Sequence, residues 1–237
     1  MRTAQLEQGY LAHPDSGVHP GVIVLHDVWG VSEHTRDLTR RLAAEGFSAL
    51  ALDLYRRKGA FEIRDPGAWM RGLSDPEALA DIQEAIALVR AHPSARGRKL
   101  GVVGFCMGGM YALLAACACT GLSAAVPFYG ILSHRHGILH AEGGLDPRKK
   151  PREPLEAARD LRCPLLAIFG DRDEFVPLAD IRALELALAR AAWPGEVLVY
   201  PGCGHAFLND TRPQAYRPAE AREAWTRMLG FLREQLA

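Results

Sequence analysis

The chain has 237 residues, a length that suits one large α/β domain or two small domains. Apolar residues make up 49% of the chain and charged residues 24%, a mixture that excludes disorder and low-complexity fibres. The 28 basic and 28 acidic residues cancel, so the chain lacks the basic excess of proteins that bind nucleic acid by phosphate neutralisation. We therefore predict a globular protein that has no nucleic acid among its partners.

In chain order, apolar runs of strand length alternate with segments of helical length. The pattern predicts a strand at 22–25, a helix at 33–45, a strand at 47–52, a helix that begins at 75 and continues past 89, a strand at 100–105, a helix at 107–117, strands at 124–129 and 164–169, a helix at 178–191, a strand at 196–200 and a helix at 219–235. The strands are continuous apolar runs, which is typical of a mostly parallel sheet with helices on both faces. We predict a single α/β domain over residues 1–237.

Two stretches, 55–74 and 130–156, interrupt this alternation and are candidate loops over the edge of the sheet where ligands bind. Residues 100–134 contain no Asp, Glu, Lys or Arg and are long enough to cross a bilayer. Glycines and a proline divide this segment into pieces that suit a strand, a tight turn, a buried helix and a second strand. We therefore predict no membrane span.

The cysteines are odd in number and cannot all pair with one another; they are Cys106, Cys117, Cys119, Cys163 and Cys203. Residues 1–9 contain no apolar run of the kind found in signal peptides. Together these features predict a reduced, cytoplasmic protein.

The sharpest motif is Gly-Phe-Cys-Met-Gly-Gly at 104–109, between a predicted strand and a predicted helix. It matches the nucleophile elbow of α/β-hydrolases, with Cys106 in place of serine. Such a turn needs small neighbours, lifts the thiol above the sheet edge and places it at a helix N-terminus that favours the thiolate. The backbone N–H of Met107 is then placed to donate to a developing oxyanion. The alternative is a glycine-rich turn around a buried cysteine.

A cysteine nucleophile needs a histidine base, and the histidine needs an acid to orient it. In α/β-hydrolases these groups follow one another in the order nucleophile, acid, base. His205 lies in a glycine-rich loop after the last predicted strand, and Asp171 and Asp173 follow the strand before it. The sequence therefore predicts a site built from Cys106, His205 and one of these two aspartates.

With these motifs in place, the chain resembles the dienelactone hydrolase family of α/β-hydrolases over nearly its whole length. The matching segments are 24–30, 53–55, 104–109, 128–130, Gly170 with 173–177, and 204–207. The resemblance implies the α/β-hydrolase fold, with Cys106 as nucleophile, His205 as base and Asp173 as acid. It selects Asp173 because the family's acid lies four residues before a proline, which here is Pro177.

The resemblance also implies an oxyanion hole made by the backbone N–H groups of Val28 and Met107. Where the family has a glutamate that contacts the resting thiol, this chain has Asp27, which is one methylene shorter. The family's lactonases hold a substrate carboxylate with two arginines. The first position is Asn209 here, and near the second, at 63, the chain offers only Arg64 or Arg71. This departure argues against a dienelactone-like carboxylate more than against ester or lactone hydrolysis in general.

Three aromatic residues, Trp29, Tyr129 and Phe207, are candidates to line the pocket, although each also suits the core. The histidines at 134, 136 and 140 have a metal-like spacing but no acidic or cysteine partner at ligand spacing, so we predict surface histidines and no metal.

We predict an enzyme that hydrolyses a small-molecule ester or lactone through a Cys-His-Asp triad and a thioester acyl-enzyme, without a cofactor. One alternative is a thiol-based redox sensor that uses Cys106, which has no need of His205 or Asp173. Another is a non-catalytic scaffold of the same fold that binds a ligand. The intact set of Cys, His and Asp argues against that scaffold.

Overall fold

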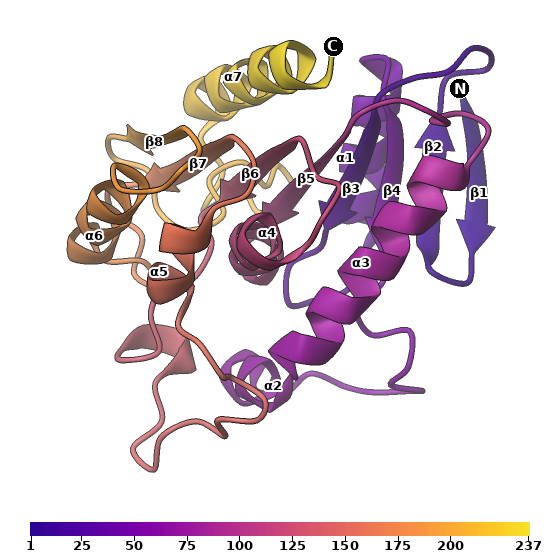
Figure 1. Cartoon of the computed structure of the whole chain (residues 1–237). Coiled ribbons are helices and arrows are strands. Elements are labelled where there is room, and N and C mark those ends of the chain that lie inside the picture. Colours follow the sequence, from indigo (N-terminus) through magenta and orange to yellow (C-terminus); the bar gives the residue numbers. More distant parts are fainter.

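Six of the eight strands run parallel within one sheet, and helices cover both faces of that sheet (Figure 1). The computed structural model describes residues 1–237, with strands β1 (Arg2–Leu6), β2 (Gly9–His13), β3 (Gly21–Leu25), β4 (Ser48–Leu52), β5 (Leu100–Phe105), β6 (Ala124–Phe128), β7 (Leu165–Gly170) and β8 (Gly195–Tyr200). The strand order is β1-β2-β4-β3-β5-β6-β7-β8. The predicted mostly parallel sheet is confirmed, and its central strands β3, β5 and β6 are buried along their whole length.

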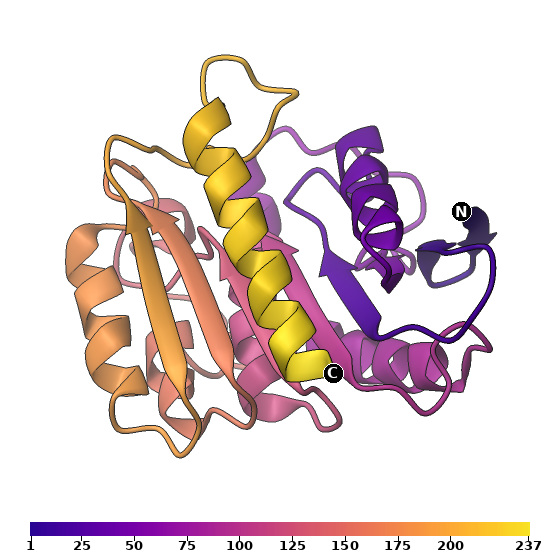
Figure 2. The same cartoon turned by 90° about the horizontal axis from the view of Figure 1, so that it is seen from above.

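The helices divide between the two faces of the sheet. They are α1 (Glu33–Ala44), α2 (Pro66–Gly72), α3 (Asp75–Ala91), α4 (Met107–Ala118), α5 (Pro154–Ala157), α6 (Leu178–Leu188) and α7 (Pro218–Leu236), with short 3₁₀ helices η1 (Gly137–Leu139) and η2 (Ala158–Asp160). Seen from above, α1 and α7 cover one face (Figure 2), and the apolar residues of α3, α4 and α6 pack in a separate core on the other. None of the helices combines the length and apolarity that a bilayer crossing requires.

The sequence did not reveal the N-terminal hairpin of β1 and β2, which joins the sheet by antiparallel pairing of β2 with β4. Four of the five residues of β1 are exposed, so no apolar run marks this edge strand. The strand is held mainly by its pairing with β2 and carries little local signal.

The two stretches predicted as loops contain helices, so that prediction was wrong in part. The first contains α2, which the side chain of Asp65 caps by accepting the Ala68 N–H at 3.0 Å. The second contains η1 and the beginning of α5. Arg71 of α2 donates to the carbonyl oxygen of Ile138 in η1 at 2.7 Å, which ties the two stretches together beside the sheet edge.

A buried ion pair anchors the second stretch to the body of the molecule. The Lys150 ammonium lies 2.6 Å from Oδ1 of Asp75, the first residue of α3, and Tyr111 of α4 donates to the same oxygen at 2.9 Å. All three side chains are buried. Because a buried charge is costly without its partner, this contact fixes the path of residues 130–154 over the sheet edge.

Candidate active site

The turn between β5 and α4 holds Cys106 in a strained conformation, with φ of 57° and ψ of −116°. A non-glycine residue seldom adopts a positive φ, and such strain is concentrated at functional sites. A Cβ on Gly104 would lie 1.9 Å from the carbonyl oxygen of Gly108, and a Cβ on Gly108 would lie 2.1 Å from that of Leu25. Only glycine fits at both positions, so the turn has the tightness that a nucleophile elbow requires.

The loops after β7 and β8 bring His205 and Asp173 together. His205 Nδ1 lies 2.8 Å from Asp173 Oδ2, and Asp173 Oδ1 accepts the Phe175 N–H at 2.8 Å. The other candidate acid, Asp171, instead accepts the backbone N–H of Gly202 at 2.6 Å. The structure therefore pairs Asp173 with the histidine and leaves Asp171 to hold the histidine loop in place.

The protonation of His205 depends on its charged neighbours. Burial lowers the pKa of this imidazole, but the Cys106 thiolate and the hydrogen-bonded Asp173 carboxylate more than offset that effect and raise the pKa to about 10. The ring is therefore protonated at neutral pH as long as Cys106 is a thiolate, which makes the two an ion pair. The other cysteines are buried, and burial raises the pKa values of Cys117 and Cys163 to about 12 and those of Cys119 and Cys203 to about 11.

Removing the thiolate is expected to lower the pKa of His205. In the wild type, we expect the ring to lose its proton as the pH rises through about 10, and in Cys106→Ala at a lower pH because one stabilising negative charge is gone. Nitrogen NMR of the imidazole across a pH series measures both midpoints. Cys203→Ser is the control, since that thiol is uncharged at neutral pH. A wild-type midpoint below neutrality would show that the site rests as a neutral thiol and imidazole.

The loop after β3, residues 26–30, is fixed by a buried histidine. His26 Nδ1 lies 2.5 Å from the carbonyl oxygen of Asp27, and His26 Nε2 accepts the Leu54 N–H at 3.1 Å. Burial lowers the pKa of His26, so the ring is neutral and carries its proton on Nδ1. Asp27 Oδ1 accepts the Trp29 N–H at 2.9 Å. The Asp27 carboxylate thus closes a turn in this loop, and no hydrogen bond joins it to Cys106.

Tyr55 connects this loop to the elbow, a role that sequence reasoning missed. Its hydroxyl donates to the carbonyl oxygen of Val28 at 2.9 Å and lies 3.2 Å from Sδ of Met107. The backbone N–H groups of Val28 and Met107 take part in no hydrogen bond of the loops or turns. Met107 is the first residue of α4, where backbone N–H groups have no acceptor within the helix. In the sequence, the one feature that singles out Tyr55 is its place in segment 53–55, which carries part of the family resemblance.

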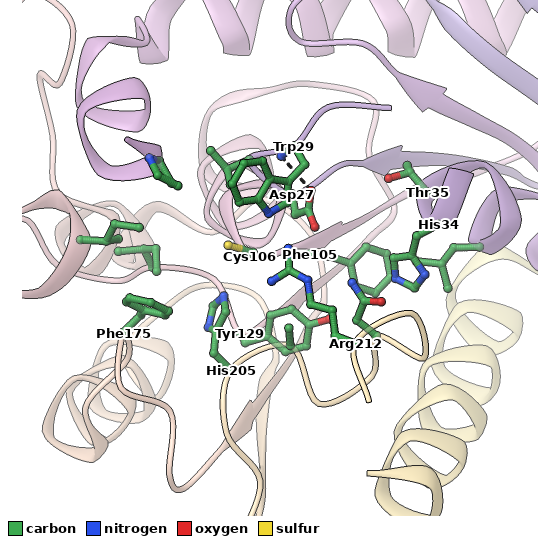
Figure 3. Close-up of a pocket in the computed structure, with 17 residues that line it drawn as sticks. Asp27, Trp29, His34, Thr35, Phe105, Cys106, Tyr129, Phe175, His205 and Arg212 are labelled. Atoms are coloured by element: carbon green, nitrogen blue, oxygen red, sulfur yellow. Dashed lines mark hydrogen bonds between the residues drawn. The ribbon is translucent and has the colours of Figure 1, made fainter. Parts of the chain in front are cut away.

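A pocket of about 140 Å³ opens beside Cys106 and His205 (Figure 3). Of the predicted residues, the pocket is lined by Asp27, Val28, Trp29, Cys106, Tyr129, His205 and Asn209. Phe207 is fully buried and packs behind the pocket, with its ring centre 5.8 Å from that of Tyr129. The small volume suits a small acyl group better than the larger ligands that most pockets hold.

Neither predicted arginine reaches this pocket. The Arg64 side chain is 83% exposed and pairs with Glu62, and Arg71 is occupied by the carbonyl oxygen of Ile138. The arginine that does line the pocket is Arg212, seven residues after His205. Among the three spaced histidines, His136 lies 2.7 Å from Asp180, and no three His, Cys, Asp or Glu side chains are arranged to hold a metal ion.

Comparisons with known proteins identify the family of this chain. The model of the dienelactone hydrolase family matches residues 8–236. A protein of Escherichia coli strain K12 named "Putative carboxymethylenebutenolidase" is 35% identical over 232 residues, which cover 95% of this chain and 81% of that protein. A Bradyrhizobium protein named "Probable 2-oxo-3-(5-oxofuran-2-ylidene)propanoate lactonase" is 31% identical, over 96% of this chain and 89% of its own length.

A solved structure points to the same family. The crystal structure described as a "Putative Dienelactone Hydrolase" from Klebsiella pneumoniae subsp. pneumoniae MGH 78578 superposes with a TM-score of 0.82 and 33% identity, covering 93% of this chain and 90% of that one. The fold, the strained elbow and the family match together show that this chain belongs to the dienelactone hydrolase family of α/β-hydrolases, which makes it an ester- or lactone-hydrolysing enzyme.

Proposed function

We propose that this enzyme cleaves a small-molecule ester or lactone through a covalent thioester on Cys106, with His205 as the proton carrier and Asp173 as the acid that orients it. The observation that carries the proposal is the 2.8 Å contact of His205 with Asp173 beside a strained Cys106 in the same pocket. A redox sensor needs neither that contact nor an apolar pocket, so both features favour hydrolysis over the sensor. The five unpaired cysteines support a reducing, cytoplasmic location.

In the first half of the reaction, the Cys106 thiolate attacks the carbonyl carbon and the carbonyl oxygen becomes an oxyanion. The N–H groups of Val28 and Met107 donate to that oxyanion, and each such donor is typically worth about 2.7–4 kcal/mol of transition-state stabilisation. The carbon–oxygen bond to the leaving group then breaks. The imidazolium of His205 gives its proton to the leaving oxygen, and the acyl group remains on Cys106 as a thioester.

In the second half, the neutral His205 takes a proton from a water molecule as that water attacks the thioester. The same two N–H groups stabilise the second oxyanion. Collapse of this intermediate breaks the carbon–sulfur bond, releases the carboxylic acid and restores the thiolate beside a protonated His205. Asp173 holds Nδ1 through both halves, so that Nε2 always faces the reacting atoms.

Three further residues support the reaction by position. His26 and the Asp27 carboxylate fix the turn that presents the Val28 N–H, and the Tyr55 hydroxyl holds the other side of the same peptide segment. We propose that Asp27 shapes this loop in place of the contact with the resting thiol that its family counterpart makes. An oxyanion hole depends on such rigid support, because its donors stabilise charge only when they are already in place.

Trapping the acyl-enzyme tests the proposal directly. The protein is mixed with excess p-nitrophenyl acetate, quenched in acid and digested, and the acetyl group is located by peptide mass spectrometry. We expect acetylation of the peptide that contains Cys106 during turnover and none at that peptide in Cys106→Ala. Turnover of the ester with equal acetylation of both proteins, or with the label on another side chain, would contradict the thioester mechanism.

A further inference from the structure

A buried tyrosine presents a hydroxyl without a partner to the active-site pocket. Tyr129 follows β6 and lines the pocket with Cys106 and His205, although the residue is only 2% exposed. Figure 3 shows its ring beside that of His205, and the two ring centres lie 5.1 Å apart in an edge-to-face contact. The hydroxyls of Tyr55 and Tyr111, which are also buried, donate to acceptors of the chain, whereas that of Tyr129 forms no hydrogen bond. The oxygen is not enclosed by the core either, so its free donor faces the pocket.

The backbone at Tyr129 is strained. Its φ is 38°, and the other two non-glycine residues with a positive φ, Cys106 and Ala206, line the same pocket. Neighbouring strands fix this conformation from both sides, because the Cys106 N–H donates to the Phe128 carbonyl oxygen at 3.0 Å and the Tyr129 N–H donates to that of Ile168 at 2.7 Å. Strain of this kind persists only where the surroundings impose it, and it clusters at functional sites.

The strand order places this hydroxyl on the leaving-group side of Cys106. The loop that carries the proposed oxyanion donor Val28 follows β3, which lies on one side of β5 and of the Cys106 turn. Tyr129 follows β6, on the other side of β5, and His205 follows β8, further in the same direction. An ester whose carbonyl oxygen points to Val28 therefore directs its leaving oxygen toward Tyr129 and His205.

The phenol of Tyr129 keeps its proton at neutral pH. Burial raises the pKa of this group, and the negative charge of the Cys106 thiolate raises it further. The hydroxyl is thus a neutral donor that can give a hydrogen bond without giving up its proton. A fixed donor of this kind stabilises negative charge that develops on an oxygen, as it does on the leaving oxygen when the bond to carbon breaks.

We propose that Tyr129 is a further catalytic residue, whose hydroxyl donates a hydrogen bond to the leaving oxygen of the substrate. The proposal rests on the thioester mechanism above. As the carbon–oxygen bond breaks, its electron pair stays on the leaving oxygen, the His205 imidazolium supplies the proton, and the Tyr129 proton remains on the phenol. A thiolate leaves more readily than an alkoxide, so without such help the intermediate formed from an alkyl ester reverts to the free ester. Tyr129 therefore extends the substrate class from activated aryl esters to esters and lactones of ordinary alcohols.

Removal of this single oxygen tests the role. The substrates are p-nitrophenyl acetate, phenyl acetate and benzyl acetate, whose leaving oxygens are successively more basic. In Tyr129→Phe we expect kcat/KM to fall less than about threefold for the nitrophenyl ester and about 10- to 100-fold for the benzyl ester, the range expected for one hydrogen bond to a charged group, with phenyl acetate between them. A role in packing alone would lower kcat/KM for all three esters alike.

The matched control is Tyr200→Phe, which removes the same oxygen from a buried tyrosine outside the pocket. The Tyr200 hydroxyl also has no partner, so its loss should leave kcat/KM for all three esters within about twofold of the wild type. Equal losses on the three esters in Tyr129→Phe, or no loss on any, would overturn the role of the hydroxyl while hydrolysis through Cys106 stands. If the wild type hydrolyses none of the three, the proposed reaction fails and the role of Tyr129 falls with it.

Discussion

Replacing Cys106 by alanine is expected to lower kcat/KM for ester hydrolysis by about 10⁴-fold or more, the loss seen when a covalent nucleophile is removed from a triad. The thiolate supplies the bond-forming electron pair in the proposed reaction, and no other cysteine lines the pocket. The remaining cysteines are also protonated at neutral pH, since burial raises their pKa values to about 11 or 12. The measurement is the steady-state rate on a short p-nitrophenyl ester.

Two controls separate chemistry from folding in this variant. Cys203→Ser changes a buried thiol two residues from His205 and should retain activity if the fold is kept. Alanine at position 106 tolerates the positive φ about as well as cysteine does, so Cys106→Ala should unfold within a few degrees of the wild type. Activity of Cys106→Ala within about tenfold of the wild type would exclude Cys106 as the nucleophile.

Cys106→Ser is expected to be nearly as inactive as the alanine variant, although serine serves as the nucleophile in many α/β-hydrolases. In the proposed mechanism Cys106 acts as a thiolate, and its negative charge, together with Asp173, raises the pKa of His205 to about 10. A serine hydroxyl does not ionise beside that imidazole, so the variant needs His205 to begin as a neutral base. Wild-type activity in Cys106→Ser would show that the resting ion pair is unimportant for catalysis.

The sequence predicts the centre of this fold well because the central strands are buried on both faces. Their continuous apolar runs, such as those of β3 and β5, mark parallel strands without reference to any other part of the chain. The order of nucleophile, acid and base along the chain then places Cys106, Asp173 and His205 after the strands β5, β7 and β8, and the structure brings these three residues to one place.

The features that sequence reasoning missed depend on contacts between distant segments. The β1–β2 hairpin has an exposed outer strand and joins the sheet through β4, some forty residues away. Arg212 enters the pocket only because the turn at Asn209 directs it there, while Arg64, which lies nearer the family position, points to solvent. Residue spacing predicts which groups follow a strand, but the path of a loop decides which of them face the substrate.

Asp173→Asn is expected to reduce kcat by about 10⁴-fold while the fold is retained, as happens when the acid of a triad loses its charge. Asp173 Oδ1 accepts the Phe175 N–H, so an asparagine at this position keeps its carbonyl oxygen there and turns its amino group towards His205. An amino group donates to Nδ1 and forces the imidazole proton onto Nε2. In that tautomer His205 has no free nitrogen to accept a proton from water.

The matched control for this prediction is Asp171→Asn, which makes the same chemical change two residues earlier. Asp171 accepts the Gly202 N–H through Oδ1, and an asparagine oxygen does so equally well, so near wild-type activity is expected. The two variants remove the same charge from neighbouring positions, and only the contact with His205 distinguishes them. A large loss in Asp171→Asn with little loss in Asp173→Asn would move the role of the acid from Asp173 to Asp171.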